Sequence, residues 1–325
     1  LYSLIVPIIS VSGIFLSYYN QQKRYKLLIS NGINPVKATN IIFNNPEVTK
    51  PNLLIIIGSI FFVIFTLVVG TSKMALSQEI VFVGSFMIIL FLLFKLSNEL
   101  DANAKKMLIG TAIIIFVFRA MPGVGQGGSW FEIDILGFDQ EFLSLLGLIA
   151  SFLTILGIFV LRPLMEKSSM TRLIVILSIA GSFFILPSIA MFYGFHEFTS
   201  KLTNGLVDAR FIAIFNTALE SPLGQVSMIP ILAWIAQSAP NHLKATFFAV
   251  LASFTNLALS ASNLGTKYLN QIYVITREVK NDLGIIKTPA DYSELGILLI
   301  IVCVLTLTIP ISVTYIVKKL KLLSY

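Results

Sequence analysis

The chain has 325 residues, of which 56% are hydrophobic and only 12% are charged. Soluble domains carry about 25% charged residues, so this composition excludes a soluble globular protein and indicates an integral membrane protein. The formal net charge of +7 comes from lysines and arginines scattered over short connections, a pattern that gives no indication of a nucleic-acid partner.

Nine apolar segments are long enough to cross a bilayer, for which a helix needs about 20 residues. They lie at about 2–19, 52–71, 79–95, 107–121, 141–161, 172–193, 211–237, 244–274 and 293–317. The predicted fold class is therefore all-α, a polytopic transmembrane helix bundle. Residues 20–51 form the longest connection, and a short surface helix is predicted there at about 35–43.

The basic residues of the connections predict the orientation, because cytoplasmic loops carry an excess of Lys and Arg. The two sets of alternating connections hold 15 and 6 of these residues. This difference places the C-terminus in the cytoplasm and Leu1 at the outer face, and we expect the membrane to be the cell (inner) membrane. Because Leu1 already belongs to an apolar segment, we also expect the chain to be part of a longer protein.

The chain lacks the spacings of common metal, cofactor and nucleotide motifs. Cys303 is the one cysteine, and His196 and His242 lie far apart in predicted connections. No GxxxxGK[ST] loop is present, and the GxGxxG pattern at 123–128 follows an apolar span instead of a strand. We therefore predict no metal and no cofactor. The connection at 129–142, SWFEIDILGFDQEF, is interpreted as a solvated, acid-rich loop.

One span has a polar face. Within 244–274, polar residues recur at alternating spacings of three and four, which places them on one side of a helix. This polar stripe consists of Ser253, Asn256, Ser260, Asn263, Lys267 and Asn270. Lipid offers no hydrogen bonds, so the stripe must face other helices or water. It is interpreted as one wall of a polar cavity. The alternative is a helix-packing interface in which small residues allow close approach and Asn side chains bond across it.

Three charged residues lie inside predicted spans, where burial is costly and marks either function or mutual pairing. Glu220 lies near the midplane beside Pro222 and Gly224, where a helix is expected to kink or open. Arg119 lies in the fourth span, and a structural pair between Arg119 and Glu220 is the alternative to a functional role for each. Lys267 either serves the cavity or extends to the outer interface.

Two stretches resemble the folate–biopterin transporter family of the major facilitator superfamily. They are FRAMPGVGQGGSWFEIDILGFDQEFLSLLGLIASFLTILG at 118–157 and the run at 220–270, which contains the pattern A-P-x-x-x-x-A-T-x-F-A. The resemblance implies a major-facilitator-like fold of twelve spans in two six-helix halves. Residues 1–100 would then be three spans of a partial N-terminal half, and 101–325 a complete C-terminal half. The linker at 96–106 is very short for this superfamily.

The resemblance implies a secondary active transporter of a folate-like or pterin-like organic anion, proton-coupled and working by alternating access. In this hypothesis Arg119 and Lys267 bind the anion. The guanidinium of Arg119 can grip a carboxylate with two parallel hydrogen bonds. Gln225, Asn256 and Asn263 offer paired donors and acceptors to the pteridine edge. Glu220 carries the proton.

Two other hypotheses remain beside this one. The chain could be a non-transporting or degenerate membrane subunit derived from a transporter, and the retained polar stripe argues against this. An intramembrane enzyme would need a nucleophile–base pair or metal ligands at matched depth, and the spans hold no histidine and a single acid. We therefore predict a protein that is not an enzyme, whose partners are a small-molecule substrate and the lipid bilayer.

Overall fold

In the computed structural model the chain forms two compact units, Leu1–Asn52 and Leu53–Tyr325. The structure describes residues 5–42, 53–72, 74, 76–224, 226, 228–238, 244–281 and 283–322.

The first unit consists of two helices, α1 (Ile5–Ser30) and α2 (Pro35–Ile42). Gly32 turns the chain between them with a positive φ of 79°, a conformation that glycine adopts without steric cost. The side chain of Asn34 then accepts a hydrogen bond from the backbone N–H of Val36 and so caps α2. Helix α2 confirms the short helix predicted in this connection.

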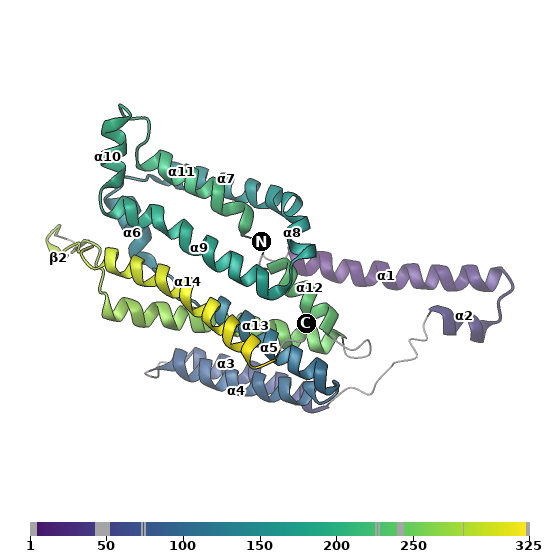
Figure 1. Ribbon diagram of the computed structural model, residues 1–325. Coiled ribbons are helices and arrows are strands. Elements are labelled where there is room, and N and C mark those ends of the chain that lie inside the picture. The colour runs from purple at the N-terminus through teal and green to yellow at the C-terminus, as the bar shows by residue number, and fades with distance from the viewer. Residues whose placement is uncertain are drawn as a thin grey trace. The chain divides into compact units, whose positions relative to one another are not determined.

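The second unit holds the remaining helices and one short hairpin (Figure 1). Its elements are α3 (Leu53–Gly70), α4 (Ser77–Ser97), α5 (Ala102–Arg119), α6 (Gln126–Asp134), α7 (Gln140–Val160), α8 (Arg162–Lys167), α9 (Met170–Phe192), α10 (Phe195–Leu202), α11 (Ala209–Glu220), α12 (Met228–Ser238), α13 (Lys244–Ile272), β1 (Val279–Lys280), β2 (Ile286–Thr288) and α14 (Leu295–Lys319). Side chains of Asp101, Asp139, Ser169 and Asp208 cap the helices that follow them.

Within the described residues, five helices are long and apolar enough to cross a membrane: α4, α7, α9, α13 from Thr246 onward, and α14. Helix α3 contains a shorter apolar stretch, Ile56–Gly70. The chain is thus an all-α integral membrane protein with several spans. The predicted spans 2–19 and 107–121 also correspond to helices, α1 and α5, but a total of nine membrane crossings stays a prediction.

The predicted span 211–237 is broken in the middle. Helix α11 ends at Glu220, a single 3₁₀ turn follows at Ser221–Leu223, and α12 begins at Met228. Pro222 lies in this turn, has no N–H to donate and restricts the residue before it, so the α-helix ends there. The predicted opening beside Pro222 is confirmed.

Helix α7 approaches this break closely. The Thr154 hydroxyl donates to the Ser221 carbonyl oxygen at 3.0 Å. A Cβ added to Gly157 would collide with the backbone carbonyl oxygen of Pro222, which cannot move aside as a flexible side chain would. Gly157 is therefore required for the contact between α7 and the broken helix.

We expect Gly157→Ala to destabilise the protein by about 1–3 kcal/mol, the usual cost of overpacking a closely packed contact. Gly147→Ala is the matched control in the same helix, because a Cβ at Gly147 meets no atom within 4 Å. Thermal unfolding of both variants in detergent measures the difference. Equal melting temperatures for the two variants would show that α7 does not pack on the break as described.

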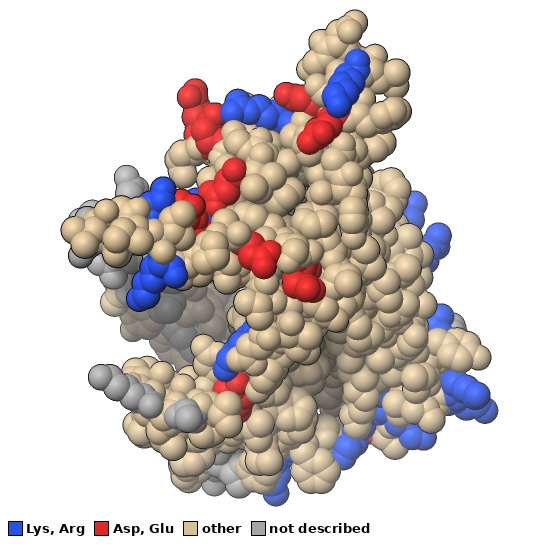
Figure 2. Space-filling view, turned by 90° about the vertical axis from the view of Figure 1, so that its left-hand side faces the viewer, with Lys and Arg blue, Asp and Glu red and all other residues tan. Residues whose placement is uncertain are grey.

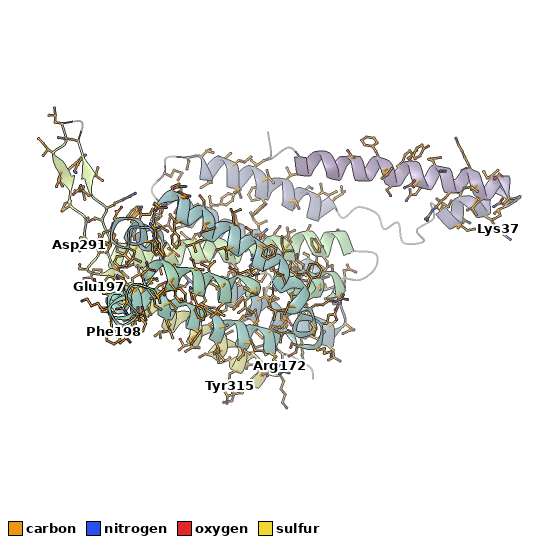
Figure 3. All side chains as sticks on the ribbon, turned by 90° about the horizontal axis from the view of Figure 1, so that it is seen from above. Lys37, Arg172, Glu197, Phe198, Asp291 and Tyr315 are labelled. Atoms are coloured by element: carbon orange, nitrogen blue, oxygen red, sulfur yellow. The ribbon has the colours of Figure 1, made fainter. Side chains whose placement is uncertain are left out.

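Charged side chains gather in parts of the surface. Figure 2 shows acidic side chains over the middle and top of the face that it views, with some lysines and arginines among them and others along its right-hand and lower edges. In Figure 3, Glu197, Phe198 and Asp291 lie toward one end, and Arg172 and Tyr315 lie toward the other. The predicted orientation assigns the Arg172 end to the cytoplasm, and this assignment stays a prediction.

The interpretation of 129–142 as a solvated loop is correct only in part. Its first half forms helix α6, and Phe131 and Phe138 are buried, whereas Asp134, Asp139 and Glu141 are exposed. Asp134 at the end of α6 accepts two hydrogen bonds from Arg277 and one from Tyr292 at 2.7 Å. The hydrogen bonds from Arg277 and Tyr292 hold the pKa of Asp134 below its usual value. Burial, followed by the bond to Asp134, raises the pKa of Tyr292 to about 12.

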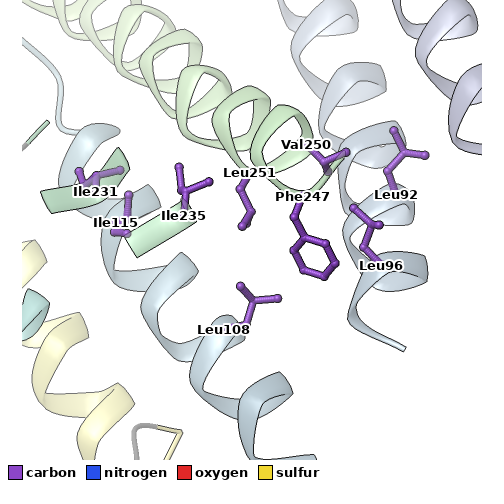
Figure 4. Packing of buried hydrophobic residues seen from close by; sticks show 9 residues of the cluster. All are labelled: Leu92, Leu96, Leu108, Ile115, Ile231, Ile235, Phe247, Val250 and Leu251. Carbon is purple, nitrogen blue, oxygen red and sulfur yellow. The ribbon is translucent and has the colours of Figure 1, made fainter. Parts of the chain in front are cut away.

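Helix α13 is central to the packing of the second unit, where it contacts α4, α5 and α12. The first half of α13 anchors a buried cluster that includes residues of all four helices (Figure 4). This apolar cluster consists of Leu92, Leu96, Leu108, Ile115, Ile231, Ile235, Phe247, Val250 and Leu251. Helices α3 and α4, which belong to the predicted residues 1–100, pack in the same unit as the later helices. The boundary near residue 100 stays a prediction.

Candidate functional site

A cavity of about 470 Å³ lies between α3, α4 and the second half of α13. Its volume falls within the range of about 300–1,000 Å³ that is usual for small-molecule sites. We call it the α13 cavity. It is lined by Phe62, Thr66, Gln78, Val81, Phe82, Ser85, Ile89, Ser253, Asn256, Leu257, Ser260, Asn263 and Leu264.

Four of the six stripe residues line this cavity: Ser253, Asn256, Ser260 and Asn263. Their three- and four-residue spacing along α13 keeps them on one helix face, which here points at α3 and α4. The amide groups of Asn256 and Asn263 each carry two donor hydrogens and one acceptor oxygen. The cavity wall can therefore bind a ligand edge that alternates donors and acceptors.

Two hydroxyl groups in the wall have no hydrogen-bond partner among the residues that the structure describes. Ser85 on α4 is only 2% exposed, and its Oγ is buried and unpaired. The Oγ1 of Thr66 on α3 is also buried and unpaired. A buried polar atom without a partner costs about 1–3 kcal/mol, more than a typical hydrogen bond contributes. Ser85 and Thr66 are thus placed to gain a partner when a polar ligand enters.

Aromatic rings form another part of the wall. Phe62 and Phe82 line the cavity, and Phe82 stacks on Phe86 with 5.9 Å between ring centroids. Behind them, Phe86 packs on Phe116, which packs on Phe254. Flat aromatic rings pack well in offset or edge-to-face geometry, so this wall suits a planar heteroaromatic ligand.

The ends of the α13 cavity have different chemistry. Toward the N-terminus of α13 the apolar cluster fills the space between α4, α5 and α12. Toward its C-terminus the Lys267 ammonium donates to Oε1 of Glu79 on α4 at 2.6 Å. The Tyr268 hydroxyl donates to the same oxygen at 2.9 Å. Lys267 is therefore ion-paired, and both alternatives for it, a role in the cavity and extension to the outer interface, stay predictions.

The structure places Arg119 and Glu220 outside the lining of this cavity. One terminal nitrogen of Arg119 lies 3.0 Å from the sulfur of Met228, and its Nε is buried without a partner. Among the described residues, no ion pair joins Arg119 to Glu220, so the structural-pair alternative for these two is not observed. Gln225 lies outside the described residues.

Asn270, the last stripe residue, also lies outside the cavity lining. Its Nδ2 donates to the carbonyl oxygens of Val124 and Thr266 at 3.1 and 2.9 Å. It fastens the segment after α5 to α13, as do bonds from Ser262 Oγ to Met121 O and from Gly123 N to Thr266 Oγ1. One part of the stripe therefore lines the cavity, and Asn270 instead packs α13 against the segment after α5.

Glu220 lines a second cavity, of about 310 Å³, together with Glu132 of α6. We call it the acidic cavity. The polar side chains around the two carboxylates are Ser188, Asn216 and Thr217. Burial raises the pKa of Glu132 above its usual value. Sequence reasoning missed Glu132, although Trp130, Phe131 and Ile133 beside it were a signal of partial burial.

Comparison with known proteins identifies the chain. A model of the BT1 family matches residues 48–324, which include every element of the second unit. The chain belongs to the BT1 family. Together with the curated relative described next, this match confirms the predicted resemblance to the folate–biopterin transporters.

One curated relative is the "Folate-biopterin transporter" of Synechocystis sp., which is 21% identical over 158 residues. The match covers 49% of this BT1-family chain but only 31% of the relative, so the chain aligns with about a third of that protein. No solved structure shows significant similarity to the chain.

Proposed function

We propose that this BT1-family chain acts in secondary active transport of a folate-like or pterin-like organic anion across the cell (inner) membrane. The observation that carries the proposal is the α13 cavity, with its unpaired Ser85 hydroxyl, inside a multi-pass membrane protein. Family membership and the name of the Synechocystis relative support the substrate class.

The cavity has the parts that a pteridine ring needs. The ring is planar, and its edge alternates nitrogen donors and acceptors with a carbonyl oxygen. Asn256 and Asn263 would hydrogen-bond that edge, while Phe62 and Phe82 would pack against the ring. Ser85 and Thr66 would complete the polar contacts from the opposite helices. None of the cavity-lining side chains is charged, so the charge of the anion has to be met elsewhere.

Alternating access would work across this site. In our proposal α3 and α4 belong to one half of the transporter and α13 to the other, and the two halves rock about the cavity. The apolar cluster would close the cytoplasmic end and the Lys267–Glu79 pair the outer end. The predicted cytoplasmic C-terminus fixes these directions.

Proton coupling would take place in the acidic cavity, apart from the substrate. Glu220 ends α11 at the helix break, where a small rotation of α12 would change its surroundings. Glu132 lines the same cavity, and two carboxylates that share one cavity repel each other when both are ionised, which favours binding of a proton by one of them. Arg119, half-buried and beside Met228 of α12, is proposed to respond to the same movement.

Uptake into proteoliposomes tests the proposal. The chain is reconstituted, and tritiated folic acid and biopterin are offered with and without an inward proton gradient. We expect saturable uptake of at least one of them, increased by the gradient. A non-transporting or degenerate subunit would bind or ignore these compounds but would show no uptake above protein-free liposomes, and that result would overturn the proposal.

A further inference from the structure

The ion pair at the end of the α13 cavity leaves Glu79 incompletely satisfied. Its Oε1 accepts from both Lys267, at 2.6 Å, and Tyr268, at 2.9 Å. Its Oε2 is buried and has no hydrogen-bond partner in the described part of the chain. An ionised carboxylate has about four lone-pair sites and is usually bonded through both oxygens when it is buried. One oxygen of Glu79 therefore receives all the contacts while the other receives none.

The pair adjoins the cavity on both helices. Gln78, the residue before Glu79, lines the cavity, as does Asn263, which lies one helical turn before Lys267. Four residues of α-helix rise by about 6 Å, so the Lys267 backbone lies just beyond the last amide of the wall. A ligand whose ring is held by Asn256 and Asn263 would place a side chain several ångströms long at Lys267.

We propose that Glu79 is a resident carboxylate in a carboxylate-binding subsite, and that a substrate carboxylate replaces it on Lys267 and Tyr268. The inference rests on the proposed function, since it assigns the charged part of the substrate of the same cavity. It makes Glu79 a specificity-determining residue: the neutral wall binds the pteridine ring, and the exchangeable pair distinguishes carboxylated pteridines from carboxylate-free ones.

The exchange keeps one carboxylate on the ammonium and the phenol hydroxyl, because one leaves as another arrives. The site as a whole gains the negative charge of the substrate, so the displaced Glu79 carboxylate has to be hydrated. Lys267 and Glu79 side chains are 35% and 18% exposed, so water reaches the pair and can hydrate Glu79 after it is displaced. The ammonium exchanges one charge-assisted contact for another of the same kind, so the cost of the displacement is mainly that of hydrating Glu79.

The test compares two ligands that share the pteridine ring. Folic acid carries carboxylates on its tail and biopterin carries none. Binding of each to the full chain in lipid nanodiscs is measured by calorimetry. For Lys267→Gln we expect folic acid to bind about tenfold more weakly or worse, because a charge-assisted bond is lost, with biopterin changed less than twofold. For Glu79→Gln we expect folic acid to bind about threefold more tightly, because the competing carboxylate is gone.

Two further variants keep the test independent of folding. The double variant Glu79→Gln/Lys267→Gln leaves no unpaired charge and should bind biopterin normally and folic acid as weakly as Lys267→Gln does. Asp134→Asn is the matched control, because Asp134 also accepts from a cation, Arg277, and a phenol, Tyr292, but lies outside the α13 cavity lining. It should leave both affinities unchanged.

Three results would overturn the proposal. Equal loss of both ligands in the Lys267 and Glu79 variants would make the pair structural. Weaker folic acid binding in Glu79→Gln would show that the Glu79 carboxylate does not compete with the substrate carboxylate. If the difference in affinity between folic acid and biopterin disappears in Arg119→Lys and not in Lys267→Gln, the substrate carboxylate binds at Arg119. Failure of both ligands to bind the unmodified chain would reject the proposed function itself, and the inference would fail with it. Binding of biopterin without binding of folic acid would reject the inference alone.

Discussion

Replacing Asn256 and Asn263 together by leucine should weaken pteridine binding by about a hundredfold or more. Both amides line the α13 cavity, and each would leave a donor or acceptor of the ligand edge unpaired when removed, at about 1–3 kcal/mol apiece. Folding should be preserved, because these two side chains are exposed and, within the described part of the chain, neither is seen to hydrogen-bond another helix. Calorimetric titration of biopterin in nanodiscs measures the loss.

Asn270→Leu is the matched control for this prediction. Asn270 belongs to the same stripe, but it supports Val124 and Thr266 and does not line the cavity. It should lower the melting temperature through an unpaired carbonyl, at a cost of about 1–3 kcal/mol, and leave affinity within a fewfold. If Asn270→Leu abolishes binding while the double variant binds normally, the ligand does not occupy the α13 cavity.

Glu220→Gln should abolish accumulation of substrate against a gradient while leaving exchange across the membrane. The glutamine resembles the protonated carboxyl in shape and neutrality but cannot release a proton, so the carrier can cycle with substrate bound but cannot use the proton gradient. Proteoliposomes loaded with unlabelled substrate measure exchange, and empty vesicles under a pH gradient measure accumulation.

Glu132→Gln locates the proton within the acidic cavity. If the two carboxylates share it, this variant should shift the pH dependence of uptake and retain part of the accumulation. Glu197→Gln serves as the control, because Glu197 lies in α10 outside the acidic cavity lining. A Glu220→Gln chain that still concentrates substrate with the original pH dependence would remove Glu220 from the coupling mechanism.

Local chemistry made part of this structure predictable. The spacing from Ser253 to Asn263 alone places four polar side chains on one face of a helix, and the structure puts that face on a cavity. Pro222 cannot continue an α-helix, and the structure breaks there. Both features depend on one segment of sequence and on the geometry of its own backbone.

The missed features depend on contacts between distant segments. Glu79 and Lys267 are 188 residues apart, and Glu79 at the edge of a predicted span resembled an ordinary interfacial acid. The burial of Glu132 results from the packing of α6 close to α9 and α14, where it shares a cavity with Ser188 and Leu299. Its acid-rich segment gave the same composition that a solvated loop would have. The spacing of polar and apolar residues within one segment cannot predict contacts with residues far away in the chain.

Labelling at Ser260, an exposed residue of the cavity wall, tests the central claim, that the α13 cavity binds the transported pteridine, most directly. In a Cys303→Ser background, Ser260→Cys is treated with a small methanethiosulfonate reagent in proteoliposomes, with and without saturating folic acid or biopterin. The account predicts reaction at this position and protection by either ligand. Reaction at an unchanged rate in the presence of a ligand that the same vesicles transport would contradict it.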